Sequence, residues 1–467
     1  MSFTSGAFLV LMGLFMAGWG FVRPHRNLRW IAITGASFVF YGWWDWRFLP
    51  LLAGTGLLDY LAALAMERWP SWRRPLLWAS VASNIGVLAF FKYLRFLVAQ
   101  LVAAADVPAA VSDMADGIVL PVGISFYTFQ SLSYTIDVYR GHIRAVRDPF
   151  HFFAFLSMFP QLVAGPIVRA VDLLPQLETP GNFNRANRMH GLRLAAWGYL
   201  KKAVVADSIA PLVNEAFGAS PELGLAWWIV AGAFALQIFC DFSGYSDIAC
   251  GIAYWMGYQF PTNFRRPYAA IGPRDFWSRW HITLSTWFRD YVYVPLGGSR
   301  LGASRTAANQ TFTMLVSGLW HGANWTFVAW GAYHAALLQA ERVLTGGRTT
   351  EFRGWKRWIT WATTLAAVVA GWVLFRAESI RQALQVYLQM LGLSGPGVLP
   401  RSVAVPSVLI AASVMSLACV HHSVSKRRPR LAVSCWPLPL QGVAVVAALA
   451  ASVFLRGPGS DFIYFQF

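Results

Sequence analysis

The sequence predicts an all-α polytopic membrane protein, and three observations support this prediction. Only 13% of the 467 residues are charged and 57% are hydrophobic, whereas a soluble domain carries roughly 25% charged residues. The mean hydropathy is positive, at +0.47. The chain also contains repeated apolar runs that approach the length of about 20 residues needed to span a bilayer. These observations exclude a soluble enzyme, a disordered chain, a coiled coil and a secreted disulfide scaffold.

The apolar runs are the expected spans, and the charges between them set their orientation. Basic loops face the cytoplasm, so the arginine-rich loops after the first and third runs place the N-terminus outside. Segment 106–116 contains three aspartates and no basic residue, which suits an outer loop. The first charge, Arg23, follows the first apolar run, so no secretory signal peptide is expected. The runs lie near residues 4–22, 30–46, 48–66, 76–105, 117–138, 224–258, 358–375, 402–420 and 436–455.

Residues 149–170 interrupt this pattern. They contain Pro160, Gly165 and Pro166, which are incompatible with a regular spanning helix. We therefore expect a re-entrant element, which is tolerated at membrane depth only when it is buried in protein or lines a wet cavity. Basic residues downstream indicate that both of its ends face the cytoplasm: Arg169, Arg185, Arg188, Lys201 and Lys202.

Two later segments also differ from a simple span. Residues 263–305 carry seven arginines against two acids, which indicates an interfacial or cytoplasmic helical segment. Residues 310–340 are apolar but interrupted at 321–324, and basic residues flank both ends, so a broken helical hairpin is expected. The net charge of +17 is thus explained by topology and contact with anionic lipid rather than by nucleic acid.

Two of the nine histidines are candidate catalytic residues. His321 lies in an apolar region between Trp320 and Gly322, and an ionisable group at membrane depth is a functional-site hypothesis by default. The alternative is a core histidine bonded to a carbonyl, but the adjacent glycines favour close approach of a ligand. His281 belongs to an amphipathic segment, where helical spacing would place Ser285 on the same face. On the residues alone, a structural helix that packs its tryptophans against the bundle while Arg279 and Arg289 reach the interface is preferred for this segment. For His334 a structural role is preferred.

Asp241 and Asp247 are conspicuous carboxylates within an otherwise apolar run. We expect them to form structural hydrogen bonds and to pair with the arginines of 263–305, because no Cys/His cluster near them suggests a metal site. The cysteines form no CxxC pair, so free thiols are expected rather than a disulfide framework.

Several segments resemble the membrane-bound O-acyltransferase family, specifically its bacterial alginate O-acetylase branch. The resemblance covers about residues 40–335 and implies a ring of tilted transmembrane helices around a central tunnel, with re-entrant and interfacial helices. It also implies acyl transfer to a hydroxyl, with His321 the principal catalytic residue and His281 the second polar position. The segments, in the family's order, are Tyr41–Trp44, Gly123–Gln130, Phe159–Val168, Asp241–Asp247, Phe276–Leu296 with Gly297 and Gly298, and Ser317–Trp325.

Acyl transfer needs a base to take the hydroxyl proton and a group to stabilise the oxyanion. We assign His321 as the general base, His281 to binding the donor or orienting the acceptor, and Asn324, one helical turn after His321, as an orienting or oxyanion donor. On the resemblance, the substrate-binding positions are Asn324, Trp320, Arg279, Ser285, Asp290, Tyr127, Gln130, Asp241 and Asp247.

The expected reaction moves an acyl group, which we expect to be acetyl, from a cytoplasmic acyl-coenzyme A towards hydroxyls of an extracytoplasmic polysaccharide such as alginate. Arginines of 263–305 suit the phosphates of coenzyme A. Acetyl-coenzyme A is a co-substrate, and no tightly bound cofactor or metal is expected. Membrane lipid, a periplasmic acetylation protein or the polysaccharide acceptor are the expected partners. The expected location is the bacterial inner membrane.

Two alternatives stay open. One is D-alanyl or acetyl transfer to teichoic acid, peptidoglycan or cellulose. The other is a transporter of an anionic solute, since broken helices and a basic face also fit transporters. Residues 1–467 are expected to form one polytopic domain, with a motif-bearing core at about 40–335 and C-terminal helices at 356–467.

Overall fold

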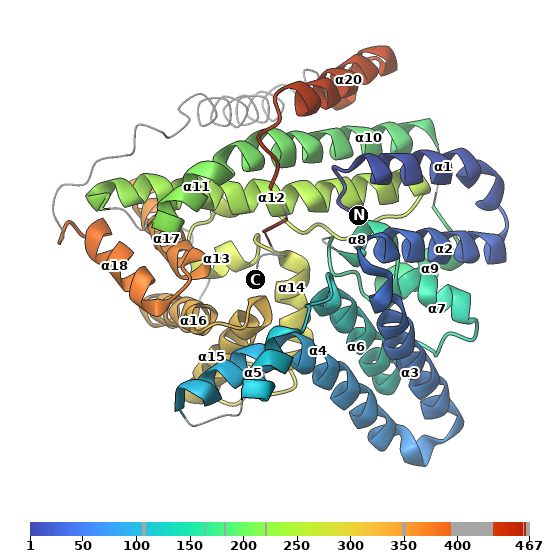
Figure 1. Ribbon diagram of the computed structural model, residues 1–467, viewed down its shortest axis with the longest axis horizontal. Helices are drawn as coiled ribbons and strands as arrows, with labels where there is room; N and C mark the ends of the chain where they lie inside the picture. Colours follow the sequence, from blue (N-terminus) through green and yellow to red (C-terminus); the bar gives the residue numbers. More distant parts are fainter. Residues whose placement is uncertain are drawn as a thin grey trace. The chain divides into compact units, whose positions relative to one another are not determined.

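The computed structural model describes residues 1–104, 109–163, 165–181, 184–219, 222–347, 352–393, 433–460 and 462–463. Helices dominate this part of the chain, and no strand occurs among the described residues (Figure 1). The chain folds into two compact units. Unit 1 comprises Met1–Ala195 and Tyr245–Pro261, and unit 2 comprises Ala196–Gly244 and Thr262–Phe467.

The first half of the chain holds long helices followed by short ones. The 3₁₀ turns Trp46–Phe48 and Pro70–Trp72 join the second, third and fourth helices. The α-helices of this half are α1 (Gly6–Val22), α2 (Arg26–Asp45), α3 (Leu49–Arg68), α4 (Arg73–Ala104), α5 (Ala109–Asp116), α6 (Ile124–Arg140), α7 (Pro149–Leu156), α8 (Phe159–Leu162), α9 (Ala170–Glu178) and α10 (Arg185–Tyr199).

The second half contains two π-helical segments, Leu200–Ala206 and Arg289–Tyr293. Its 3₁₀ turns are Gly224–Ala226, Pro267–Ala269 and Val433–Cys435. Its α-helices are α11 (Asp207–Ala219), α12 (Trp227–Met256), α13 (Pro273–Trp277), α14 (Ile282–Phe288), α15 (Ala303–His321), α16 (Trp325–Thr345), α17 (Gly354–Arg376), α18 (Ile380–Met390) and α20 (Leu438–Phe454).

The helices coincide with the predicted apolar runs. Four helical stretches of the described chain are long and apolar enough to cross a membrane, and α1 and α20 are shorter apolar helices. The predicted run 117–138 begins as a helix only at Ile124, because Gly123 adopts a positive φ of 77° and starts α6. The predicted span 402–420 lies outside the described residues. The four stretches are Arg26–Arg68, Pro70–Val102, Gly224–Met256 and Gly354–Arg376.

In unit 1, helices α3, α4 and α6 pack side by side around a buried carboxylate (Figure 1). The Asp59 side chain is fully buried. It accepts hydrogen bonds from Ser80 Oγ at 2.6 Å, from Asn84 Nδ2 at 2.7 Å and from Ser131 Oγ. Because a buried carboxylate is tolerated only with such partners, this network fixes the three helices to one another.

The interrupted segment 149–170 is broken as predicted. Short helices α7 and α8 end at Leu156 and Leu162, with irregular backbone between and after them. Most of its described side chains are buried in protein. The backbone therefore breaks where the prolines require it and is covered by other parts of unit 1.

In unit 2, α15 and α16 form the broken hairpin predicted for 310–340. Glycines let the two helices touch: a Cβ at Gly318 would lie 2.2 Å from the Phe327 carbonyl oxygen, and one at Gly331 would lie 2.5 Å from the Met314 carbonyl oxygen. The hairpin packs against α17. This close crossing brings His321, the last residue of α15, beside the first turns of α16.

Candidate active site

His281 lies immediately before α14 in a fully buried position. Its backbone has φ 40° and ψ 55°, in the left-handed region that non-glycine residues rarely adopt. The prediction that His281 and Ser285 share one helical face is wrong, because the helix begins only at Ile282. Ser285 Oγ instead donates to the Trp280 carbonyl at 3.3 Å.

Asn263 fixes the tautomer of His281. The Asn263 Oδ1 atom lies 3.0 Å from His281 Nδ1 and also accepts from Thr283 Oγ1 at 2.9 Å and from the Thr283 backbone N–H at 3.4 Å. An amide oxygen can only accept, so Nδ1 carries the proton. The buried Nε2 of His281 is left as an acceptor with no protein partner among the described residues.

The surroundings of His281 keep it neutral. Phe242 meets its ring edge-on at a centroid distance of 4.6 Å, and Phe264 stacks at 6.3 Å. Burial lowers the pKa of His281 to about 3, because an apolar environment disfavours the charged imidazole. At neutral pH the ring therefore offers a lone pair at Nε2 and no charge.

The structure brings the two predicted histidines to one aromatic side chain. The Trp320 ring lies 5.0 Å from the His321 ring and 6.1 Å from the His281 ring, measured between centroids. Trp330 and Phe375 complete the surroundings of His321 at 5.0 and 5.2 Å. Residues distant in sequence thus converge in unit 2 on a buried aromatic cluster that holds two imidazoles.

Asn324 differs from its prediction. The helix of His321 ends at His321, and the backbone at Gly322 is extended, so Asn324 does not lie one helical turn further on. Asn324 Oδ1 caps α16 by accepting from the Thr326 backbone N–H at 3.0 Å, and Nδ2 donates to the Glu378 carbonyl at 2.9 Å. Its side-chain groups thus hold the hairpin turn in place.

The arginine-rich segment 263–305 consists of short helices and turns, and none of the four apolar helical stretches lies within it. Two of its arginines pair with its two acids: Arg279 Nε lies 2.7 Å from Asp275 Oδ1, and Arg289 Nε lies 2.6 Å from Asp290 Oδ1. Arg279 and Asp290 are predicted substrate-binding residues, and each has an ion-pair partner within this segment.

Asp241 pairs with Lys202 and not with the arginines of 263–305, which corrects that prediction. Lys202 Nζ lies 2.8 Å from Asp241 Oδ1 and 2.7 Å from Asp207 Oδ1. All three side chains are buried, so Lys202 is not the cytoplasmic loop charge that the charge pattern predicted. Asp247 lies on the part of α12 that belongs to unit 1, where it is partly exposed.

Tyr127 and Gln130 are buried on α6 in unit 1. The Tyr127 ring packs edge-on against Tyr41 at 6.5 Å, and Gln130 Nε2 donates to the Val168 carbonyl at 3.4 Å. Segments 41–44, 123–130 and 159–168, which carry the family resemblance, therefore meet within one unit.

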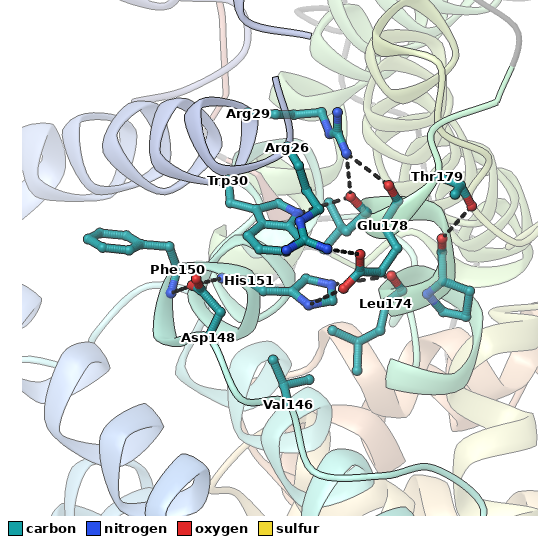
Figure 2. A network of polar contacts seen from close by, with 12 residues as sticks. Arg26, Arg29, Trp30, Val146, Asp148, Phe150, His151, Leu174, Glu178 and Thr179 are labelled. Carbon is teal, nitrogen blue, oxygen red and sulfur yellow. Dashed lines mark hydrogen bonds and ion pairs between the residues drawn. The ribbon is translucent and has the colours of Figure 1, made fainter. Parts of the chain in front are cut away.

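A polar network around His151 was not predicted from the sequence (Figure 2). The His151 ring stacks on Trp30 at 4.3 Å with an interplanar angle of 6°, and its Nδ1 lies 3.3 Å from Glu178 Oε1. Arg29 donates to the backbone carbonyls of Leu177 and Glu178 at 2.9 and 3.0 Å. These contacts join α2, α7 and α9 within unit 1.

Sequence reasoning missed Asn263 and Lys202. Asn263 lies 18 residues before its partner His281, and the residues around it give no pattern that predicts this hydrogen bond. Lys202 had a signal: it is followed by the apolar stretch Ala203–Ala206 and then by Asp207. Two opposite charges separated only by apolar residues indicate a buried pair rather than a solvated loop.

Comparison with known proteins places this geometry in context. A model of the membrane-bound O-acyltransferase family matches residues 139–376. The chain is 40% identical over 400 residues to a probable alginate O-acetylase AlgI of Pseudomonas putida, covering 83% of this chain and 79% of that protein. It is 32% identical over 391 residues to a peptidoglycan O-acetyltransferase of Helicobacter pylori, covering 77% and 73%. It is 29% identical over 227 residues to a teichoic acid D-alanyltransferase of Streptococcus thermophilus, covering 46% and 54%.

Proposed function

The chain belongs to the membrane-bound O-acyltransferase family and is a multi-pass membrane O-acyltransferase, and from this premise we propose that it transfers acetyl groups towards an extracytoplasmic polysaccharide such as alginate. The observation that carries the proposal is the identity of 40% to a probable alginate O-acetylase over most of both chains. Identity is lower to the peptidoglycan and teichoic acid enzymes. Those polymers are therefore the second candidates as acceptors.

The proposed donor is acetyl-coenzyme A on the cytoplasmic side of the inner membrane. Its phosphates need cationic partners, and residues 263–305 carry seven arginines against two acids. His281 lies within this segment, so the donor would bind beside the aromatic cluster. The proposed recipients are a periplasmic acetylation protein or the polysaccharide itself.

In the proposed reaction His321 acts as the general base. It takes the proton from the acceptor hydroxyl as the oxygen attacks the thioester carbonyl carbon. The carbon–sulfur bond then breaks, and the proton passes to the departing coenzyme A sulfur. A general base works best when its pKa lies near the operating pH, and the pKa of about 3 makes His281 unsuitable for that task.

His281 is proposed to orient the acceptor. Its Nε2 lone pair, fixed by Asn263, can accept a hydrogen bond from a hydroxyl. The Trp320 ring lies against both imidazoles and so links the two proposed positions. The assignment separates proton removal at His321 from hydroxyl alignment at His281.

Radiolabelled acetyl-coenzyme A offered to proteoliposomes tests the reaction. Wild-type protein should move label to an acceptor, and His321→Ala should lower the rate on the order of 10²–10⁴-fold, the usual contribution of general acid–base catalysis. The matched control is His25→Ala, because His25 is exposed and makes no side-chain capping bond. Wild-type rates in His321→Ala would refute the base assignment.

The acceptor is tested in cells. A deletion strain should make exopolysaccharide with reduced O-acetyl content, and the wild-type gene but not His321→Ala should restore it. Unchanged O-acetyl content on the polysaccharide, together with a loss from peptidoglycan, would move the proposal to the second candidate.

A further inference from the structure

The C-terminal strap, here Gly457–Ser460 with Phe462 and Ile463, is bound into unit 2 by a buried ion cluster. Lys202 Nζ lies 2.8 Å from the Ser460 carbonyl oxygen, in addition to its contacts with Asp207 and Asp241. Lys202 Nζ also donates to Ser460 Oγ at 3.3 Å, so both oxygens of Ser460 lie against the ammonium group. The strap therefore supplies two of the hydrogen-bond acceptors that a buried lysine requires.

The strap also satisfies the two carboxylates. Ser460 Oγ donates to Asp207 Oδ1 at 2.7 Å, and the Ile463 backbone N–H donates to Asp241 Oδ2 at 2.7 Å. One lysine cannot neutralise two carboxylates, and an unpaired buried charge is strongly unfavourable. Removal of the strap would leave each carboxylate without one donor, so the network favours the docked position.

The backbone of the strap fits closely where it begins. The Gly457 N–H donates to the Ala203 carbonyl at 2.9 Å. A Cβ at position 457 would lie 2.3 Å from the Asp207 carbonyl carbon, so only glycine fits. Three of the anchoring contacts use main-chain atoms of the strap, which fixes its path independently of its side chains.

The anchored strap leads to the candidate active site. Phe462 is fully buried and packs against Phe242 at 5.6 Å, in an edge-on arrangement. Phe242 in turn meets the His281 ring at 4.6 Å. Phe242 directly follows Asp241, so one point on α12 both anchors the strap and supports the imidazole.

We propose that the C-terminal strap is a positioning element of the acyl-transfer site, which acts on His281 through Phe242. Lys202, Asp207 and Asp241 are positioning residues that hold the strap in place. The proposal rests on the role given to His281 above. It adds a dependence of that role on a segment more than 170 residues away in sequence.

A double-mutant cycle between Phe462 and His281 tests the proposal. In wild-type protein Phe462→Ala should lower kcat of acyl transfer on the order of 10–100-fold, as expected for misplacement of an orienting group, with KM for acetyl-coenzyme A unchanged. In a His281→Ala background the same change should have less than about a twofold effect, because coupled residues are not additive. Equal effects in both backgrounds would overturn the proposal.

Two further measurements separate positioning from folding. Phe454→Ala is the matched control, since that phenylalanine is 83% exposed at the end of α20, and it should leave kcat unchanged. Diethyl pyrocarbonate, which modifies neutral imidazoles, should react faster at His281 in Phe462→Ala and in Lys202→Met. Its rate at the equally buried His334 should not rise; parallel increases at both histidines would indicate general loosening and contradict the proposal.

The outcomes also separate this proposal from the proposed function. If His281→Ala transferred acetyl at the wild-type rate, the role of His281 would fail. The modification rates would still report whether the strap holds that imidazole. If His281→Ala were impaired while Phe462→Ala was not, the strap proposal alone would fail.

Discussion

At the scale of single residues, the candidate site depends on how a neutral imidazole is held. Asn263 gives the His281 ring one defined tautomer, and the aromatic rings around it disfavour the charged form of the imidazole. The sequence and its family resemblance predicted His281 and His321 as site residues, but the partners assigned to them from helical spacing, Ser285 and Asn324, do not hold the two rings. Hydrogen bonds between segments are not visible in local spacing, which explains why Asn263 was missed.

The Asn263 contact leads to a prediction about the tautomer. Asn263→Ala should lower kcat on the order of 10–100-fold, because a ring without a fixed tautomer and orientation no longer aligns the reacting hydroxyl. Thr283→Val is the matched control, because it removes another hydrogen bond to the same oxygen and leaves the His281 contact intact. Steady-state acetyl transfer measures both variants, and equal rates for Asn263→Ala and wild type would contradict the tautomer argument.

Burial of His281 also predicts acid sensitivity. Its pKa is about 3 in the folded protein and about 6.5 when unfolded, so below pH 6.5 the unfolded state binds a proton that the folded state does not. The folded state is therefore destabilised as the pH falls from 6.5 towards 3. The equilibrium constant for unfolding rises by at most about tenfold per pH unit in this range. Melting of detergent-solubilised protein at pH 7.5 and 5.5 measures this loss.

The control for this pH dependence is a histidine on the surface. His281→Phe should show a smaller difference in melting temperature between the two pH values, whereas His25→Phe should match the wild type, because His25 is exposed. An unchanged difference in His281→Phe would show that other groups cause the acid sensitivity.

At the scale of elements, the α15–α16 hairpin positions His321. The crossing is close because Gly318 lies against the backbone of α16. The interruption at 321–324 and the flanking charges were sufficient to predict this hairpin. The role of Asn324 was not predictable from spacing, because the helix ends at His321 and the asparagine becomes a cap of the following helix.

Gly318→Ala should separate the two helices. The added Cβ would lie 2.2 Å from the Phe327 carbonyl oxygen, and overpacking of this kind costs about 1–3 kcal/mol. The shift should also lower acetyl transfer, since His321 follows on the same helix. Gly232→Ala on α12 is the control, because its Cβ would meet nothing within 4 Å, and its melting temperature should not fall; a Gly318→Ala protein as stable as this control would contradict the packing argument.

At the scale of the whole molecule, composition and periodicity predicted most of the helices. A spanning helix needs about 20 apolar residues. The helices of the described chain occupy nearly the same positions as the predicted apolar runs. The charge pattern was less reliable for individual residues, since it treats every lysine as a loop residue. Lys202 is an exception because two buried aspartates compensate it. The ring-and-tunnel arrangement implied by the family concerns both units together and stays a prediction.

The backbone at His281 has a consequence for how the sequence can vary. Its φ of 40° is one that glycine or asparagine adopts more readily than histidine. A chain optimised for stability alone would therefore favour another residue at this position. Directed evolution for thermostability should therefore select substitutions at position 281 that lower activity. Stability and turnover should trade off at this one residue.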